Sequence, residues 1–325
     1  MLFNPDYSLK ILTGKEFSES IGSINEALEK CRNSGFFKCF DGKKIYYEYF
    51  LCKDAKASVV IVHGLSEFTK KYYELAYYFL NLGYNVFLYD QRCHGLSERL
   101  TERVDLIHVD RFDDYVKDLE IYIDTIIAEN NSGKPLYMFS HSMGGTVTAM
   151  YLKKHTDKVE KAVLSAPLFE PQIGNIPVRL ARLTLAMKHL LCGKKSVFQE
   201  RRFDPDGAMK RSTDTDRDRF MYNLNMRCSE PKYQSTPMTT RWVYNSLRLV
   251  PDFKKHRIAE SITTPLLLIS AQNDTVVRND RQTAFAEKCA ACRMLTIESA
   301  THSIMTGGYD ILTHYINEIV NFIKL

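Results

Sequence analysis

The chain has no long hydrophobic run. None of its apolar stretches approaches the roughly 20 consecutive apolar residues that a membrane-spanning helix requires. The first residues, 1–15, carry Asp, Lys and Glu and hold no apolar core long enough for a secretion signal. We therefore expect a cytoplasmic protein, whose contact with a membrane, if any, is peripheral.

The chain also lacks a second closely spaced cysteine pair and internal sequence repeats. Eight cysteines are scattered along the chain, and only Cys289 and Cys292 form a C-x-x-C motif. A structural zinc site would need a second pair of ligands, so we expect packed or surface thiols, as in a reducing compartment. The chain also shows no internal repeat and no low-complexity segment.

Acidic residues are scarce in one segment. Between Pro171 and Ser212, nine basic residues accompany only three acidic ones, so this segment carries +6 while the whole chain carries +5. The basic residues are Arg179, Arg182, Lys188, Lys194, Lys195, Arg201, Arg202, Lys210 and Arg211, and the acidic ones are Glu200, Asp204 and Asp206. Such a segment attracts anionic groups, including phosphate-bearing headgroups.

Strand and helix patterns alternate over most of the 325 residues. We expect a β-hairpin over 36–50 with Asp41-Gly42 as its turn. Further strands are expected at 58–63, 85–89, 137–141, 162–165, 266–269 and 294–297. Helices are expected at 72–82, 112–128, 146–154, 242–249, 282–288 and 309–323. This order predicts an α/β fold, with a mostly parallel central sheet and helices on both faces.

The alternation stops between residues 169 and 239, where five prolines interrupt the chain. We expect an N-terminal extension at 1–34, a core formed by 35–168 and 240–325, and a helical cap inserted at 169–239. With 45% apolar and 26% charged residues, the composition is that of an ordinary globular protein.

The stretch from Tyr137 to Gly145 predicts a nucleophile. Apolar residues lead into Ser140-His141-Ser142-Met143-Gly144-Gly145, which indicates a strand, a sharp turn with Ser142 at its tip, and a helix. This arrangement is the nucleophile elbow of α/β-hydrolases, where the residues two before and two after the serine must be small. A serine that merely caps a helix after a strand is the alternative.

A serine nucleophile needs a histidine base and an acid, in the order Ser, Asp or Glu, His in this topology. Asp274 is the first carboxylate after the strand 266–269, whereas Asp280 is expected to start the next helix. His302 lies in the loop after the last strand, where open α/β sheets place their sites. The other histidines that we weighed for this role are His108, His141, His155, His189, His256 and His314.

Attack of a serine on a carbonyl group also requires two N–H donors, which bind the oxyanion of the transition state. One is expected from Met143, the residue after the nucleophile. The other is expected from Leu65, because His63-Gly64-Leu65 turns sharply after the strand 58–63. The side chain of His63 is expected to hold this loop.

Five motifs together resemble monoacylglycerol lipases and bacterial lysophospholipases. They are His63-Gly64-Leu65-Ser66-Glu67, Asp90-Gln91-Arg92-Cys93-His94-Gly95-Leu96-Ser97, Arg111 to Leu119, Ser140 to Gly145, and Ala300-Thr301-His302. The resemblance covers roughly 36–168 and 240–325. Where the family often has Gly, His and an acid, this chain has Cys93, Phe68 and Ser303.

The resemblance implies a serine ester hydrolase that acts on a single-chain lipid ester, either a lysophospholipid or a monoacylglycerol, without a metal or cofactor. An aminopeptidase or small-ester hydrolase of the same fold is the second hypothesis. The acid-poor segment argues against an aminopeptidase, which needs acids to hold a substrate ammonium. A catalytically inactive fold that serves as a binding module is the third.

Apolar residues recur at helical spacing in the basic segment, at Ile176, Leu180, Leu183, Met187 and Leu190-Leu191. We favour a cap helix whose apolar stripe packs on the domain and lines an acyl pocket. The alternative is a basic amphipathic helix that rests on an anionic membrane surface.

Overall fold

The structure is a computed structural model that describes residues 1–174, 176–197, 202–255 and 257–324. Glu200 and Arg201 of the basic segment and His256 lie outside the described residues. Within the described residues, no helix combines the length and the apolar character that crossing a membrane requires.

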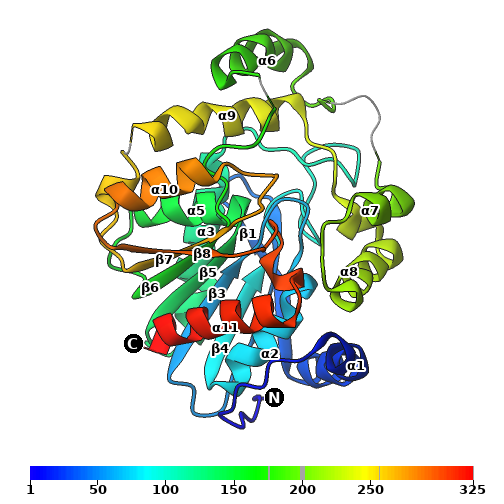
Figure 1. Cartoon of the computed structure of the whole chain (residues 1–325), viewed down its shortest axis with the longest axis vertical. Helices are drawn as coiled ribbons and strands as arrows, with labels where there is room; N and C mark the ends of the chain where they lie inside the picture. Colours follow the sequence, from blue (N-terminus) through cyan, green and yellow to red (C-terminus); the bar gives the residue numbers. More distant parts are fainter. Residues whose placement is uncertain (175, 198–201, 256, 325) are drawn as a thin grey trace.

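One eight-stranded sheet forms the centre of the molecule (Figure 1). Its strands are β1 (Arg32–Lys38), β2 (Lys44–Phe50), β3 (Ala57–Val62), β4 (Tyr84–Tyr89), β5 (Leu136–His141), β6 (Lys161–Ser165), β7 (Leu266–Ala271) and β8 (Cys292–Ile297). Their order is β1-β2-β4-β3-β5-β6-β7-β8; the pairs β1–β2 and β2–β4 are antiparallel and the others are parallel. The predicted α/β architecture is confirmed.

Helices cover both faces of the sheet, so β3, β4 and β7 are buried along their whole length. One face packs against α1 (Gly14–Cys31), α2 (Tyr73–Asn81) and α11 (Tyr309–Lys324). The other packs against α3 (Asp113–Tyr122), α5 (Met143–Leu152), α9 (Thr240–Lys254) and α10 (Asn279–Lys288). Figure 1 shows α2 and α11 on the opposite side of the sheet from α3, α5 and α10.

Two predicted elements have different bounds in the structure. The single helix expected at 112–128 is interrupted by a π-helical segment, η2 (Ile123–Ile127), before the short α4 (Ala128–Asn130). The N-terminal extension ends earlier than expected, because β1 begins at Arg32 and pairs with β2 along its length. Within the extension, Thr13 and Glu16 form a capping box that starts α1.

Between β6 and α9 the chain forms α6 (Val178–Cys192), α7 (Pro205–Arg211), α8 (Arg217–Ser229) and η3 (Pro231–Gln234). None of the described residues in this region pairs with the central sheet. Buried Arg219 fixes α8 to α2 through Glu74, with 2.9 Å between Nε and Oε2. In Figure 1, α6 lies above α9 and apart from α7 and α8.

The apolar stripe of α6 faces outward, so the favoured expectation that it packs on the domain is wrong. No residue of α6 is buried, and Leu183, Met187 and Leu191 are 69%, 67% and 81% exposed. The helix contacts α9 through its other side, where the rings of His189 and Tyr244 stack 4.0 Å apart. The helical periodicity identified the apolar face of α6 correctly. It could not show whether that face packs against the protein or is exposed.

The start of α5 passes unusually close to the end of β3. A Cβ atom built on Gly144 would lie 2.1 Å from the carbonyl oxygen of Val62 and 2.7 Å from that of His63. Because these neighbours are backbone atoms of a buried strand, they cannot move aside without disturbing the sheet. Glycine at 144 is therefore required by the approach of the helix to the strand.

We predict that Gly144→Ala lowers the free energy of unfolding by about 1–3 kcal/mol, the usual cost of overpacking. The measurement is the midpoint of a thermal or chemical unfolding curve. Gly22→Ala in α1 is the matched control, because a Cβ there has no atom within 4 Å and alanine suits a helix better than glycine. A Gly144→Ala variant as stable as the wild type would contradict the close contact.

Candidate active site

Ser142 lies at the tip of the turn between β5 and α5, with φ 51° and ψ −116°. A positive φ is costly for a residue with a Cβ, so neighbouring hydrogen bonds must hold it. The N–H of Ser142 donates to the carbonyl of Ser165 at 2.9 Å, and its carbonyl accepts from Gly145 and Leu168, both at 3.0 Å. These bonds tie the strained residue to the end of β6 and to the start of the inserted region.

The three side chains predicted to form the triad are in contact. His302 Nε2 lies 2.9 Å from Ser142 Oγ, and His302 Nδ1 lies 2.7 Å from Asp274 Oδ2. Asp274 follows β7 and His302 follows β8, at the carboxyl edge of the sheet where the elbow also lies. The geometry therefore brings together residues that are 28 and 160 positions apart in the sequence.

The surroundings favour an ionised Asp274 beside a neutral His302. Burial opposes ionisation of Asp274, but hydrogen bonds from His302 and from the backbone N–H groups of Val276 and Val277 outweigh it and lower its pKa. Burial lowers the pKa of His302 below its ordinary value, against the opposite effect of Asp274. A neutral imidazole oriented by a carboxylate can accept the proton of a serine hydroxyl.

The competing carboxylate and the first histidine have other contacts. Asp280 pairs with Arg278 at 2.8 Å, near the start of α10, as expected for a helix-starting acid. His63 is fully used by its loop: its Nε2 accepts from the N–H of Gln91 at 2.9 Å, and its Nδ1 lies 2.7 Å from the carbonyl of Gly64.

The N–H groups of Leu65 and Met143 are available for an oxyanion. Of the hydrogen bonds between described residues, none uses either group as a donor. Met143 is the first residue of α5, where the N–H groups of the first turn lack partners and the helix dipole favours negative charge. Both groups stay predictions as oxyanion donors.

Two further residues, Glu67 and His141, contact the site, although neither was predicted to belong to it. His141 lies 3.1 Å from Glu67 through Nδ1, and 3.1 Å from the backbone carbonyl of His302 through Nε2. Glu67 also accepts from Tyr72 Oη at 2.6 Å and from Gly64 N–H and Lys71 Nζ, each at 2.5 Å. His141, which was weighed as a base in place of His302, instead contacts the backbone of the loop that carries His302.

The buried Glu67 is ionised despite its surroundings. Burial alone would raise its pKa, but Lys71 and His141 outweigh this effect and hold the pKa well below its ordinary value. In the sequence, Glu67 stands three residues after Gly64 and His141 stands directly before Ser142, so both lie close to predicted site residues. Their positions alone do not show that the two side chains contact each other, because this contact forms only when β3 and β5 pair.

No group of three or more potential metal ligands occurs among the described side chains. Cys289 is buried and Cys292 half-buried, and both are free thiols.

This fold, with a contacting Ser–His–Asp set at the carboxyl edge of its sheet, defines a serine hydrolase of the α/β-hydrolase fold. The chain belongs to the family described as serine aminopeptidase, S33, whose model matches residues 53–307. The predicted relationship to monoacylglycerol lipases and bacterial lysophospholipases is confirmed by its relatives.

Among those relatives, the lysophospholipase L2 of Escherichia coli is 28% identical over 300 residues, covering 90% of this chain and 87% of the relative. The human monoglyceride lipase is 24% identical over 286 residues, covering 86% and 84%. A crystal structure of a soluble variant of monoglyceride lipase from Saccharomyces cerevisiae has a TM-score of 0.72 at 20% identity, covering 90% of this chain and 94% of that one. This structural likeness concerns the fold.

We predict that the rate at which a fluorophosphonate labels Ser142 follows the neutral form of His302. Because burial lowers the pKa of His302 below its ordinary 6.5, the labelling rate should exceed half its maximum at pH 7. It should fall to half its maximum only below pH 6.5, as acid protonates the imidazole.

Asp274→Asn should move this half-maximum to still lower pH, because the carboxylate raises the pKa of His302. It should also reduce turnover at the plateau by about 10⁴-fold, through loss of the correct tautomer. A wild-type half-maximum above pH 6.5, or an unchanged Asp274→Asn profile, would contradict the assignment.

Proposed function

We propose that this protein hydrolyses the fatty-acyl ester of a single-chain lipid, a lysophospholipid or a monoacylglycerol, through an acyl-enzyme intermediate. The observation that carries the chemistry is the distance of 2.9 Å between Ser142 Oγ and His302 Nε2, with Asp274 on the other side of the imidazole. The names of the relatives support the substrate class, since they include lysophospholipases and monoglyceride lipases.

In this mechanism His302 accepts the proton of Ser142 as the hydroxyl attacks the ester carbonyl. Asp274 holds the imidazole and stabilises its positive charge, while the N–H groups of Leu65 and Met143 bind the oxyanion. His302 then gives the proton to the departing alcohol. A water molecule, activated by the same histidine, releases the fatty acid and restores Ser142.

Ser142→Ala should abolish fluorophosphonate labelling and reduce ester hydrolysis by roughly 10³-fold or more. Ser140→Ala is the matched control, because its hydroxyl donates to the carbonyl of Val163 at 3.0 Å and does not contact His302. The measurement is turnover of lysophospholipids, monoacylglycerols and short acyl esters by the purified protein. A Ser142→Ala protein that still labels and turns over would end the assignment.

An aminopeptidase is the second candidate, because the family description names this activity. Assaying aminoacyl amides beside the acyl esters separates the two functions. Faster turnover of the amides, with no preference for longer acyl chains among the esters, would favour the aminopeptidase. A non-catalytic binding role would require that none of these substrates is turned over and that the fluorophosphonate does not label.

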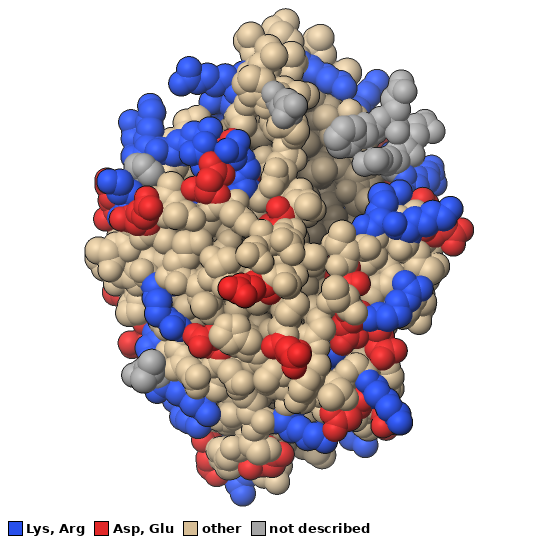
Figure 2. All heavy atoms as spheres, in the orientation of Figure 1, with Lys and Arg blue, Asp and Glu red and all other residues tan. Residues whose placement is uncertain are grey.

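We further propose that residues 169–239 act as the cap and that α6 contacts an anionic membrane surface. Six apolar residues of this region, Ile176, Leu180, Leu183, Met187, Leu190 and Leu191, are each more than half exposed. Exposed Arg179, Lys188, Lys194 and Lys195 accompany them. Figure 2 shows a tan protrusion flanked by blue Lys and Arg side chains at the end of the molecule where α6 lies in Figure 1. Contiguous apolar surface beside basic residues suits an anionic lipid interface.

The double variant Leu183→Glu with Leu190→Glu should lose binding to anionic liposomes, because it removes apolar area and adds negative charge. The measurement is co-sedimentation with anionic and zwitterionic liposomes at low and high salt. Phe36→Glu on the edge strand β1 is the control, since Phe36 is 54% exposed but far from α6 in the sequence. Wild-type binding that ignores both lipid charge and salt would remove the membrane proposal.

A further inference from the structure

A pocket lies beside the triad, between the core and the inserted region. Ser66 and Phe68 of the predicted oxyanion loop form one side, and Ser303 and Thr306, which follow His302, form another. Helix α8 closes it with Leu224 and Arg227. Because Ser66 adjoins Leu65 and Ser303 adjoins His302, the pocket lies near the groups that are proposed to bind the ester.

Arg227 is the unusual residue of this pocket. It is half-buried, and burial lowers its pKa to about 10, so that it keeps its charge at neutral pH with little water around it. Among the described residues, no carboxylate lies within ion-pair distance of its guanidinium. Partial burial of a cation without an acidic partner costs free energy, and binding of an anion to it offsets this cost.

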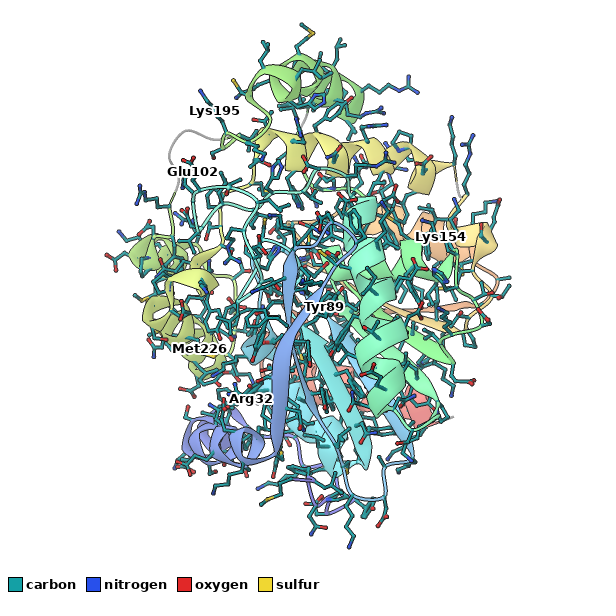
Figure 3. The ribbon with its side chains drawn as sticks, turned by 180° about the vertical axis from the view of Figure 1, so that it is seen from behind. Arg32, Tyr89, Glu102, Lys154, Lys195 and Met226 are labelled. Atoms are coloured by element: carbon teal, nitrogen blue, oxygen red, sulfur yellow. The ribbon has the colours of Figure 1, made fainter. Side chains whose placement is uncertain are left out.

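The guanidinium of Arg227 is fixed by hydrogen bonds that use only some of its N–H donors. Arg227 Nη2 donates to Thr236 Oγ1 at 2.7 Å and Nε donates to the carbonyl of Tyr233 at 3.3 Å. The ring of Phe203 lies 4.3 Å from its Cζ. Both hydrogen-bond acceptors are neutral, and a guanidinium has five N–H donors, so further donors remain for a ligand. Figure 3 labels the preceding residue, Met226, on α8.

The neighbouring charges narrow the class of anion. Lys71 is occupied by Glu67, at 2.5 Å. Asp214 lines the same pocket, and its carboxylate accepts from the hydroxyls of Ser212 and Thr306. A dianionic phosphomonoester would be repelled by Asp214. A phosphodiester with one negative charge and an ammonium group beyond it would have a partner for each charge.

We infer that this pocket is a headgroup subsite in which Arg227 binds the phosphodiester of a zwitterionic lysophospholipid. Asp214 faces the ammonium group of the same headgroup. The inference rests on the proposed ester hydrolase and selects the lysophospholipid over the monoacylglycerol. It assigns this choice to the described residues of the pocket rather than to the basic surface of α6.

The test compares three substrates with the same medium-length acyl chain below their critical micelle concentrations. They are a lysophospholipid with an ethanolamine or choline headgroup, the lysophosphatidic acid, and the monoacylglycerol. For the wild type, the kcat/KM should be highest for the zwitterionic lysophospholipid. Arg227→Gln should lower the ratio of the kcat/KM for the zwitterionic lysophospholipid to the kcat/KM for the monoacylglycerol about tenfold or more, since a charge-assisted hydrogen bond is lost.

Arg227→Lys should retain part of this ratio, because it keeps the charge without the paired donors. Arg217→Gln is the matched control: it removes the same charge from the exposed start of the same helix, outside the pocket, and should leave the ratio unchanged. Turnover of the monoacylglycerol by each variant reports whether the protein is folded and the triad works.

The outcomes separate this inference from the proposed function. If Arg227→Gln changes turnover of both substrates by the same factor, or changes neither, the inference is overturned while the ester hydrolase stands. A wild type that prefers lysophosphatidic acid or the monoacylglycerol also overturns it. If the wild type cleaves none of the three esters, the proposed function itself fails.

Discussion

The contact between the first turn of α5 and the end of β3 is the constraint on which the site depends. Only glycine at 144 lets the helix approach the carbonyl of Val62 so closely. The same turn gives Ser142 its positive φ and leaves the N–H of Met143 at the start of the helix. The strained conformation of Ser142 is thus maintained by the packing of a helix on a buried strand together with the backbone hydrogen bonds of Ser142.

A second constraint is the buried carboxylate of Glu67. It accepts hydrogen bonds from Gly64, Lys71, Tyr72 and His141, and so joins the predicted oxyanion loop to the turn just before α2 and to the residue before Ser142. His141 extends this connection to the backbone of His302. Because a buried charge is costly unless it is fully paired, the network holds both sides of the site in one arrangement.

The inserted region is attached to the core unequally. Helix α8 is fixed through the buried Arg219 and Glu74, and the ring of Phe68 stacks 4.0 Å from that of Tyr233 in η3. Helix α6 contacts α9 through the stacked rings of His189 and Tyr244, and it exposes its apolar face. The proposed headgroup pocket is therefore bordered by α8, whereas the proposed lipid-facing surface lies on α6.

The alternation of strands and helices, the turn at Ser142 and the candidate partners Asp274 and His302 could be proposed from the sequence because they depend on local patterns and on chain order. Buried strands are continuous apolar runs, and the acid and the histidine follow the last two of them. What the sequence could not reveal required the sheet to be paired first: the contact of Glu67 with His141, the outward face of α6, and Arg227 facing a pocket beside the triad. Periodicity identifies the apolar side of a helix and a motif identifies a reactive side chain. Which partner each one meets is decided by tertiary packing, because residues far apart in the chain supply the other half of every such contact.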